Sequence, residues 1–507
     1  MVFTAPFPPY DPTDKSGSIW KPKLMMNDRR FSYETVVKRW PIILTSIVDQ
    51  LHRENHNLHL TLTGEAPNPI IEKKVSEGKD IIEKVSKLKY EMARDHALVP
   101  IPQDGEPSVE LYNSELDNLA KQSKNTWFTA PWLYAEYAPV ATPRGGLLIP
   151  YLLDRCYLYR LLRSFFKQTE HWRDYDPFFS QKVDVFQKSG PSIYRIGTTM
   201  NELEAAKQSI ESDPNNIAVF FQEMIQMCLW GNATDLSLLT HMTLSDIEKL
   251  QTVEKEAQSA RKEFILKDDQ DAVWDHVKQL KDGRVDFVLD NAGFEVFTDL
   301  VFADFLVTYT PHVSKVVFHG KLIPWFVSDV TPPDFKYTIA SLLDPAYFAA
   351  ASPTEEQRQH LKAMANRIAR YVEEGVFAFS VPIDTPLGGS GSSTTGAEFW
   401  TNPLPYWDME TYAPELWKTL RDSDLVIFKG DLNYRKLTGD IKWPSTTSFK
   451  DATGPLAGTF PLLSLRTNKA DVAVGLTSEV LDAIEKKDDK WRVNGKYALI
   501  SYLPRNK

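Results

Sequence analysis

Apolar residues in the N-terminal part of the chain recur every three or four positions. This spacing runs from residue 33 to about residue 207, where no clear strand pattern occurs, and it predicts a series of helices. Two of these helices are expected at about 35–56 and 77–94. The first 30 residues are instead rich in proline and polar side chains. We therefore predict an extended arm at 1–30 and a helical domain at 31–215.

The pattern changes at about residue 217. Short apolar runs rich in β-branched and aromatic residues now alternate with helical stretches, which is typical of βαβ units and a largely parallel sheet. The sequence thus predicts an α/β domain at 216–507. The expected strands lie at 285–289, 315–318, 325–328, 424–428, 462–465 and 497–502.

One stretch of the helical part does not fit a helix. Trp132–Glu136 and Cys156–Leu162 resemble two halves of one amphipathic helix, but the proline and glycine residues of 137–155 interrupt them. This stretch is either an insertion that loops into solvent or an error in the gene model.

Two other segments have a distinct composition. The charged segment 245–260 predicts a solvated helix face, and the glycine-rich segment 387–393 predicts a flexible connector.

Composition narrows the class of protein. With 507 residues, 42% hydrophobic and 25% charged, the chain is typical of a globular protein with a large core. A net charge of −10 disfavours nucleic acid or an anionic membrane as the main partner. No apolar run approaches the ~18 residues of a membrane span, and no signal peptide is expected. Two cysteines exclude a disulfide framework and a structural zinc site. We expect a cytoplasmic location, with the nucleus as a further candidate.

Polar residues follow the first expected strand of the α/β domain. Asp290 and Asn291 come directly after 285–289, and a helical pattern begins at Glu295. Ligands bind at the carboxyl ends of strands in open α/β sheets. Carboxylate and amide oxygens are the ligands that Mg²⁺ and Mn²⁺ prefer. The alternative is a loop that carries a helix cap, because Asp and Asn are common there.

Three further strand ends carry similar groups. Asp329 follows 325–328, Lys429 and Arg435 flank a glycine-bearing turn after 424–428, and Arg466 and Lys469 follow 462–465. Acids and an amide can hold a divalent cation, while the basic residues and backbone N–H groups can hold a phosphate. A metal that bridges to phosphoryl oxygens polarises phosphorus and can activate a water. Any single Lys or Arg is still more often a surface salt-bridge partner.

Other common catalytic motifs are missing. No HExxH motif or close histidine pair is present, which disfavours a zinc hydrolase, and no P-loop occurs. Ser390 lies between two glycines but lacks the strand–turn–helix context of a nucleophile elbow.

The strand-end segments carry a family resemblance. Leu289–Glu295, Lys429–Leu437 and Arg466–Lys469 together resemble the DUF89 family of metal-dependent damage-control phosphatases. The Arg-Thr-x-Lys signature is similar to that of its third subfamily. The resemblance extends to 230–237 and 399–407 and covers most of the chain, whereas 137–155 departs from the family pattern.

The resemblance implies a helical domain packed on a three-layer α/β/α domain. It implies metal ligands at Asp290, Asn291 and Asp329, with Asp290 and Lys469 as catalytic residues. The substrate contacts that it implies, together with Lys429 from the strand-end pattern, are Asp290, Asn291, Lys429, Asp431, Leu432, Asn433, Tyr434, Arg435 and Lys469. We expect the helical domain to pack over the strand ends and close one side of the pocket.

The activity implied is the hydrolysis of sugar phosphates such as fructose 1-phosphate and fructose 6-phosphate in metabolite damage control. The expected cofactor is Mn²⁺ or Mg²⁺, with Co²⁺ or Ni²⁺ as further candidates. The nucleophile is either a water or Asp290, and a ligand role for Asp290 favours water. The alternatives are an S-adenosylmethionine-dependent protein-glutamate O-methyltransferase and a non-catalytic binding module. The chain lacks the glycine-rich strand–helix turn usual in methyltransferases, which favours the phosphatase.

Overall fold

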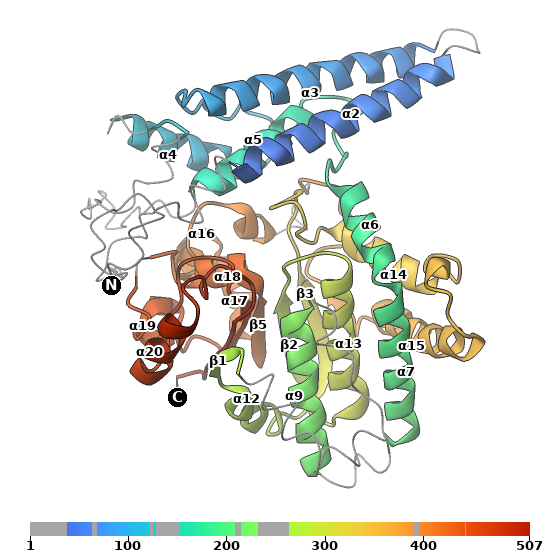
Figure 1. Cartoon of the computed structure of the whole chain (residues 1–507), viewed down its shortest axis with the longest axis vertical. Coiled ribbons are helices and arrows are strands. Elements are labelled where there is room, and N and C mark those ends of the chain that lie inside the picture. Colours follow the sequence, from blue (N-terminus) through green and yellow to red (C-terminus); the bar gives the residue numbers. More distant parts are fainter. Residues whose placement is uncertain are drawn as a thin grey trace.

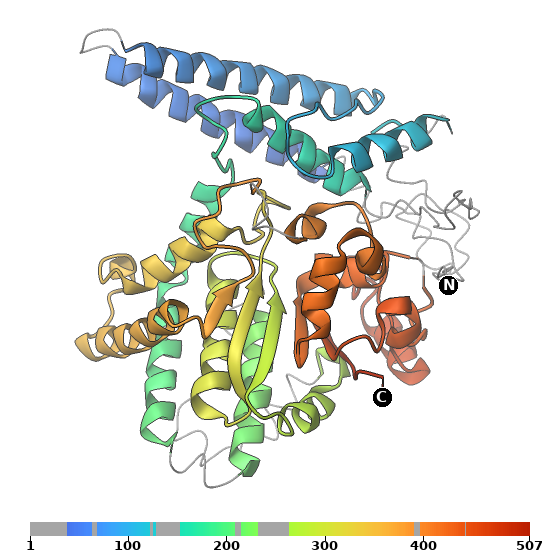
Figure 2. The same ribbon diagram turned by 180° about the vertical axis from the view of Figure 1, so that it is seen from behind.

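The computed structural model of the chain is shown in Figure 1. It describes residues 38–62, 68–121, 125–127, 153–207, 214–231, 263–389, 396–441 and 443–506. The expected arm at 1–30, the charged segment 245–260 and most of 137–155 lie outside the described residues. A layer of helices lies across one end of an α/β body in both views (Figures 1 and 2).

Four helices form the layer that we call the cap. Their bounds are α2 Trp40–Leu62, α3 Pro69–Ala93, α4 Val109–Lys121 and α5 Leu153–Lys167. The Asn68 side chain caps α3 by accepting hydrogen bonds from two backbone N–H groups, and Pro69 begins the helix. The buried residues of α3 repeat at helical spacing, as the sequence predicted. Both expected helices exist, although α2 is shifted toward the C-terminus and α3 begins earlier than predicted.

A seven-stranded sheet forms the centre of the α/β body. The strand order is β1-β7-β6-β5-β2-β3-β4, and all neighbours are parallel except β6 and β7. The expected largely parallel sheet is therefore confirmed. The sequence did not predict β1 and β4, which have only four and three residues. The strands are β1 Ile265–Asp268, β2 Gly283–Val288, β3 Val313–His319, β4 Phe377–Phe379, β5 Leu425–Lys429, β6 Leu462–Thr467 and β7 Ala498–Leu503.

Successive residues of the strands feed two separate hydrophobic cores. Phe287 packs into one core and Val288 into the other, because side chains alternate between the faces of a strand. This arrangement confirms the three-layer α/β/α domain. The first core contains α7 Gly190–Ala205, α9 Pro214–Trp230, α12 Gln270–Val277, α13 Phe294–Tyr309, α14 Pro332–Leu343 and α15 Glu355–Glu373. The second contains α16 Met409–Tyr412, α17 Pro414–Arg421, α18 Gly430–Leu437, α19 Phe449–Thr453 and α20 Ser478–Lys487.

The cap has a hydrophobic core of its own, which runs from Trp40 to Phe178 and also takes in three residues of the α/β body. The chain enters the core of the sheet with α6, at Phe179–Lys188, and α7 and α9 also pack there. The cores thus divide near residue 178, whereas the sequence placed the boundary at 215.

The short 3₁₀ helices lie at Ala349–Ala351, Ala397–Thr401, Tyr406–Asp408 and Gly454–Leu456.

One expected strand is wrong. Residues 325–328 form a turn, in which Phe326 and Val327 have positive φ angles of 45° and 75°. Their high β-propensity is overridden because the Trp325 ring is fully buried in the core of the cap. The turn still places Asp329 beside Asn291, with which it forms an isolated antiparallel bridge.

Among the described helices, none is long and apolar enough to cross a membrane.

Candidate active site

The candidate site lies at the carboxyl ends of β2 and β5. The chain leaves β2 for β3 and β4 on one side and later returns to β5 and β6 on the other, so a topological switch point separates β2 from β5. Asp290 follows β2, and Gly430 follows β5 with a φ of 81°. A Cβ atom at Gly430 would lie 1.9 Å from Asp290 Oδ2. The carboxylate of Asp290 therefore sits directly against the start of α18.

Backbone hydrogen bonds bring the three expected metal ligands together. The Val330 N–H donates to the Asp290 carbonyl over 2.9 Å, and the Ala292 N–H donates to the Ser328 carbonyl over 2.7 Å. These bonds clamp the segment after β2 to the turn at 325–328. Asp290, Asn291 and Asp329 are consequently adjacent, although Asp329 does not follow a strand.

The side chain of Asn291 is held in one orientation. Its Nδ2 donates to Asp290 Oδ2 over 2.8 Å and to Glu295 Oε2 over 2.7 Å. Its Oδ1 accepts a hydrogen bond from the Ser328 hydroxyl. Glu295, on the first turn of α13, therefore fixes the amide so that its oxygen faces the turn that carries Asp329.

The two acids are buried and repel one another. Burial raises the pKa of Asp290 well above its usual range, and the negative charges of Glu295 and Asp329 add to this effect. Burial likewise raises the pKa of Asp329 to about 7. Within the described part of the chain, Asp329 Oδ2 is buried without a hydrogen-bond partner. Clustered carboxylates with an unpartnered oxygen are a donor set that fits a hard divalent cation.

A buried lysine that the sequence analysis missed borders these acids. Lys321 Nζ donates to the Leu289 carbonyl over 3.1 Å and to Asn433 Oδ1 over 3.4 Å, and lies 3.9 Å from Asp329 Oδ2. Burial lowers its pKa, against the attraction of Asp329 and Asp290. The sequence contained a signal that could have identified Lys321. It lies two residues after β3 and thus at the same edge of the sheet as the two acids.

Lys469 also lies near Asp290. Its positive charge lowers the pKa of Asp290, which places the ammonium group within electrostatic reach of that carboxylate. The Lys469 backbone N–H donates to Asp431 Oδ1 over 3.2 Å. Arg466 organises the same loop by donating to Asp431 Oδ1 over 2.8 Å and to the Ala470 carbonyl over 2.9 Å. Arg466 is fully buried, so its role is to shape the loop that presents Lys469.

Residues 431–435, expected as a loop, form the first turns of α18. Asn433 Nδ2 donates to the Lys429 and Leu289 carbonyls over 2.7 and 3.1 Å, and its Oδ1 accepts from the Tyr406 hydroxyl over 2.6 Å. Arg435 forms an ion pair with Asp440. These side chains hold the edge of the sheet together. The segment can offer an anion the backbone N–H groups at the start of α18.

Two other expected substrate contacts are engaged with neighbouring parts of the fold. The Tyr434 hydroxyl accepts the Val474 N–H over 2.9 Å, and Leu432 packs into the core of the cap. Both residues therefore support the fold around the site, and Asp431 of this segment accepts a hydrogen bond from the Lys469 N–H.

Lys429 lies beneath the site. Its Nζ donates to Asp299 Oδ1 over 2.7 Å, to Glu295 Oε1 over 3.1 Å and to the Cys228 carbonyl over 2.8 Å. An ammonium group has three N–H donors, and all three are used here. This geometry argues against the substrate contact that the sequence suggested. Lys429 instead neutralises Glu295, which in turn orients Asn291.

The cap covers the edge of the sheet on which these groups lie. Trp325 and Leu432, both from that edge, belong to the cap's core. The Tyr112 hydroxyl donates to the Thr401 carbonyl over 2.7 Å, and Arg163 Nη2 donates to the Leu387 carbonyl over 2.9 Å. Figures 1 and 2 show α2–α5 across this end of the body. Helices α2–α5 thus pack over the strand ends as expected, whereas α7, which the sequence placed in the same domain, packs on one face of the sheet.

Comparison with known proteins identifies the family. The family model described as damage-control phosphatase ARMT1-like domain matches residues 35–484. The chain belongs to this family. The DUF89 damage-control phosphatases, expected from three sequence motifs, are thereby confirmed as its relatives.

Full-length relatives of this ARMT1-like chain are known in vertebrates. Damage-control phosphatase ARMT1 of Danio rerio is 33% identical, over 93% of this chain and 94% of its own length. The Homo sapiens protein of the same name is 30% identical, over 93% and 96%. A DUF89 family protein from Pyrococcus horikoshii, of solved structure, matches 92% of this chain and 98% of its own with 13% identity and a TM-score of 0.34.

Proposed function

We propose that this damage-control phosphatase family member requires Mg²⁺ or Mn²⁺ and hydrolyses sugar phosphates such as fructose 1-phosphate and fructose 6-phosphate. One observation carries the proposal. Two buried, mutually repelling carboxylates, Asp290 and Asp329, lie within electrostatic reach of Lys321, and Asp290 also lies against the start of α18 and within reach of Lys469. A cation and a phosphate together match this combination of charges.

Asp290, Asn291 and Asp329 are the residues that would hold the cation. Their oxygens are of the type that Mg²⁺ and Mn²⁺ prefer, and Co²⁺ or Ni²⁺ are further candidates. When bound, the cation supplies Lewis-acid polarisation of the phosphoryl group and neutralises its charge. Glu295 supports these three residues by accepting a hydrogen bond from the Asn291 amide nitrogen, which leaves the amide oxygen directed away from Glu295.

The remaining residues bind and stabilise the phosphoryl group. The backbone N–H groups at the start of α18 receive its oxygens, and Gly430 permits the close approach of Asp290 to these groups because it has no side chain. Lys469 stabilises the charge of the transition state from the opposite loop. In the reaction the oxygen of a water bonds to phosphorus while the phosphorus–oxygen bond to the sugar breaks, and the sugar leaves with a proton. Asp290 Oδ2 already accepts a hydrogen bond from Asn291, which favours water over Asp290 as the nucleophile.

The cap provides the wall that a small substrate needs. Its core includes Trp325 and Leu432 of the α/β body, so the cap packs directly on this edge of the sheet and a bound sugar would lie between the strand ends and the cap. Because the cap covers this side of the site, it keeps bulk water from the phosphoryl group and strengthens the electrostatic contacts between that group and the protein.

The proposal is tested by assaying the purified full chain. Phosphate release would be measured for a panel of sugar phosphates with Mn²⁺, Mg²⁺, Co²⁺ or Ni²⁺ and after chelation. We expect turnover of fructose phosphates that chelation removes and metal restores, that Asp290→Asn abolishes, and that Asp271→Asn, an exposed acid on α12, leaves unchanged. Turnover that persists without metal would contradict the proposal. Binding of S-adenosylmethionine without any phosphatase activity would favour the methyltransferase alternative.

A further inference from the structure

The turn that carries Asp329 has a strained backbone. Phe326 and Val327 are consecutive non-glycine residues with φ angles of 45° and 75°. A positive φ is rare for such residues, and for a β-branched residue like Val327 it is a clear outlier, because Cβ crowds the following carbonyl. Strain of this kind persists only where surrounding contacts impose it.

The contacts on the sheet side of the turn are hydrogen bonds. The Asp329 N–H donates to the Trp325 carbonyl over 3.1 Å, which closes the turn. Lys182 Nζ donates to the Asp329 carbonyl over 3.0 Å. These bonds fix the two ends of the turn, but none of them constrains the Phe326 and Val327 dihedral angles directly.

The contact on the other side comes from the cap. The Tyr159 ring of α5 stacks on the Phe326 ring, with 5.0 Å between centroids and 24° between planes. The same ring lies 5.9 Å from the Trp325 ring. Trp325 is fully buried and Tyr159 is 4% exposed, so both rings are enclosed by the cap's core. Tyr159 thus covers the strained part of the turn.

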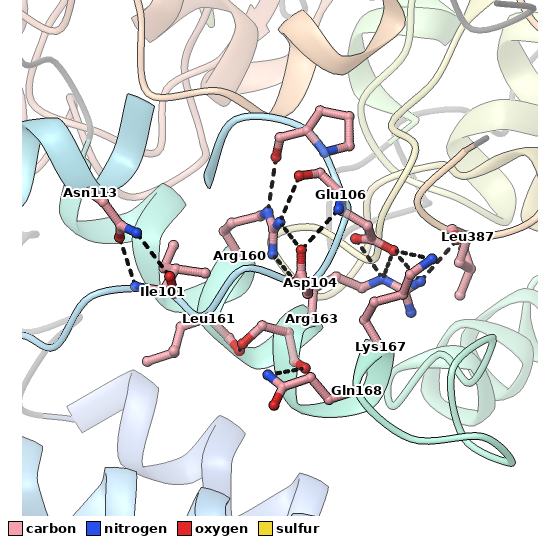
Figure 3. A network of polar contacts seen from close by, with 12 residues as sticks. Ile101, Asp104, Glu106, Asn113, Arg160, Leu161, Arg163, Lys167, Gln168 and Leu387 are labelled. Carbon is pink, nitrogen blue, oxygen red and sulfur yellow. Dashed lines mark hydrogen bonds and ion pairs between the residues drawn. The ribbon is translucent and has the colours of Figure 1, made fainter. Parts of the chain in front are cut away.

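Buried ion pairs fix the segment of α5 that presents Tyr159. Arg160 forms a two-pronged pair with Asp104 at 2.8 Å, and Arg163 Nη2 lies 2.6 Å from Glu106 Oε1. Arg163 also donates to the Leu387 carbonyl of the α/β body. Figure 3 shows both arginines on one side of α5, each facing its acid. The segment of α5 that follows Tyr159 is therefore locked to the connection between α3 and α4 through Asp104 and Glu106, and to the body through Leu387.

We propose that Tyr159 is a positioning residue that couples the cap to the cation site. Its ring holds Phe326 and Val327 in the left-handed conformation, and the turn in this conformation directs the Asp329 carboxylate toward Asp290 and Asn291. Without the stack the turn relaxes and Asp329 leaves the shared site. This inference rests on the proposed cation binding, and it adds that the site is assembled only while the cap is seated.

A metal-free measurement tests the first half of the inference. Hydrogen exchange would be followed at the Asp329 and Val330 amides, which donate to Trp325 and Asp290. Tyr159→Leu keeps an apolar side chain but removes the flat ring, and we expect exchange at both amides to become at least about 10-fold faster, as local opening becomes easier. Tyr159→Phe keeps the ring and should behave as wild type.

The matched control is the same substitution two residues earlier on α5. The Tyr157 ring packs on Trp127, and its hydroxyl donates to the Val99 carbonyl over 2.6 Å. Tyr157→Leu therefore weakens the cap without touching the turn. We expect a lower free energy of unfolding but unchanged exchange at the Asp329 and Val330 amides.

Titration with Mn²⁺ tests the second half. Tyr159→Leu should weaken Mn²⁺ binding by about 10-fold or more, the scale seen when a residue that orients a ligand is removed. Adding Val327→Gly should restore most of this loss, because glycine adopts a positive φ without strain. Such a rescue is not expected if Tyr159 only fills space in the core.

Wild-type exchange rates and Mn²⁺ affinity in Tyr159→Leu would overturn the inference. An equal loss in Tyr157→Leu would also overturn it, by showing that general packing of the cap is responsible. A wild-type protein that binds no Mn²⁺ would contradict the proposed function, whereas the exchange measurement needs no metal and would still decide whether Tyr159 holds the turn.

Discussion

Gly430 and Asp290 approach one another so closely that a Cβ atom on Gly430 would lie 1.9 Å from Asp290 Oδ2. The two residues follow adjacent parallel strands, β5 and β2, and meet at the switch point of the sheet. No side chain fits between the carboxylate and the start of α18. The charge of Asp290 is thereby held next to the backbone N–H groups that we propose as the phosphate site.

Gly430→Ala should remove activity by displacing Asp290. The new methyl group would also be strained at a φ of 81°, and strain of this kind costs of order 1–3 kcal/mol. We expect loss of both Mn²⁺ binding and turnover, with a modest fall in the melting temperature. Gly375→Ala is the matched control, because Gly375 has a φ of 71° with nothing near its Cβ position. If both variants lose activity equally, backbone strain and not the approach to Asp290 is responsible.

The three proposed metal ligands should differ in the effect of substitution. Asp290→Ala and Asp329→Ala should abolish metal-dependent turnover while leaving the fold intact, because each removes one of two buried, repelling carboxylates. Asn291→Asp should change the preference among Mg²⁺, Mn²⁺ and Co²⁺, since it adds a negative charge to the set. Calorimetric titration with each metal measures these effects. Normal metal binding by Asp329→Ala would remove Asp329 from the ligand set.

Lys469→Ala should slow the chemical step without weakening the cation. We expect turnover to fall by about 10²-fold or more, the scale for removal of one donor that stabilises transition-state charge. Mn²⁺ affinity should stay close to that of wild type. Lys496→Ala, an exposed lysine at the other end of the same connection, is the control. Unchanged turnover in Lys469→Ala would show that its ammonium group does not meet the phosphoryl group.

Lys429→Met should chiefly destabilise the protein. The substitution leaves Asp299 and Glu295 buried without their cation, and breaking a buried pair in this way costs about 3–5 kcal/mol. Chemical denaturation measures this loss. Lys469→Ala, in contrast, should unfold like wild type. A stable Lys429→Met protein with a raised KM would instead support the substrate contact that the sequence suggested.

Glu115 should make stability depend on pH. Burial raises the pKa of this carboxyl from 4.5 to about 7, and both of its oxygens are buried without a hydrogen-bond partner in the described part of the chain. Between these values the folded state binds more protons than the unfolded state, so stability falls as pH rises from about 4.5 to 7 and stays reduced above it. The shift corresponds to about 3 kcal/mol.

Glu115→Gln tests this dependence. Above pH 7 the variant should be more stable than wild type, because no carboxylate has to be buried in its charged form. Below about pH 4.5 the difference should vanish, since Glu115 is then protonated in both states. Melting temperatures across the pH range measure the effect, with Asp117→Asn, an exposed acid on α4, as control. Parallel pH profiles for wild type and Glu115→Gln would contradict the assignment.

The sequence by itself determined the type of sheet and the edge at which the site lies. Alternating strand and helix patterns require parallel strands, and parallel strands end at one common edge, so the polar residues after 285–289, 424–428 and 462–465 had to gather there. The adjacency of Asp290, Gly430 and the Lys469 loop follows from this local information. The two short strands escaped prediction because three or four residues carry too weak a pattern.

Only the tertiary structure decided how individual side chains are used. The Trp-Phe-Val run at 325–327 has strand propensity, but the cap buries its rings and turns it into the strained loop that delivers Asp329. Lys429 resembles a phosphate ligand in sequence, yet the acids of α13 draw its ammonium group beneath the site. Lys321 joins the site because its strand lies beside β2. Propensity reflects neighbours along the chain, whereas these roles depend on charges and rings that come from remote segments and meet only in the fold.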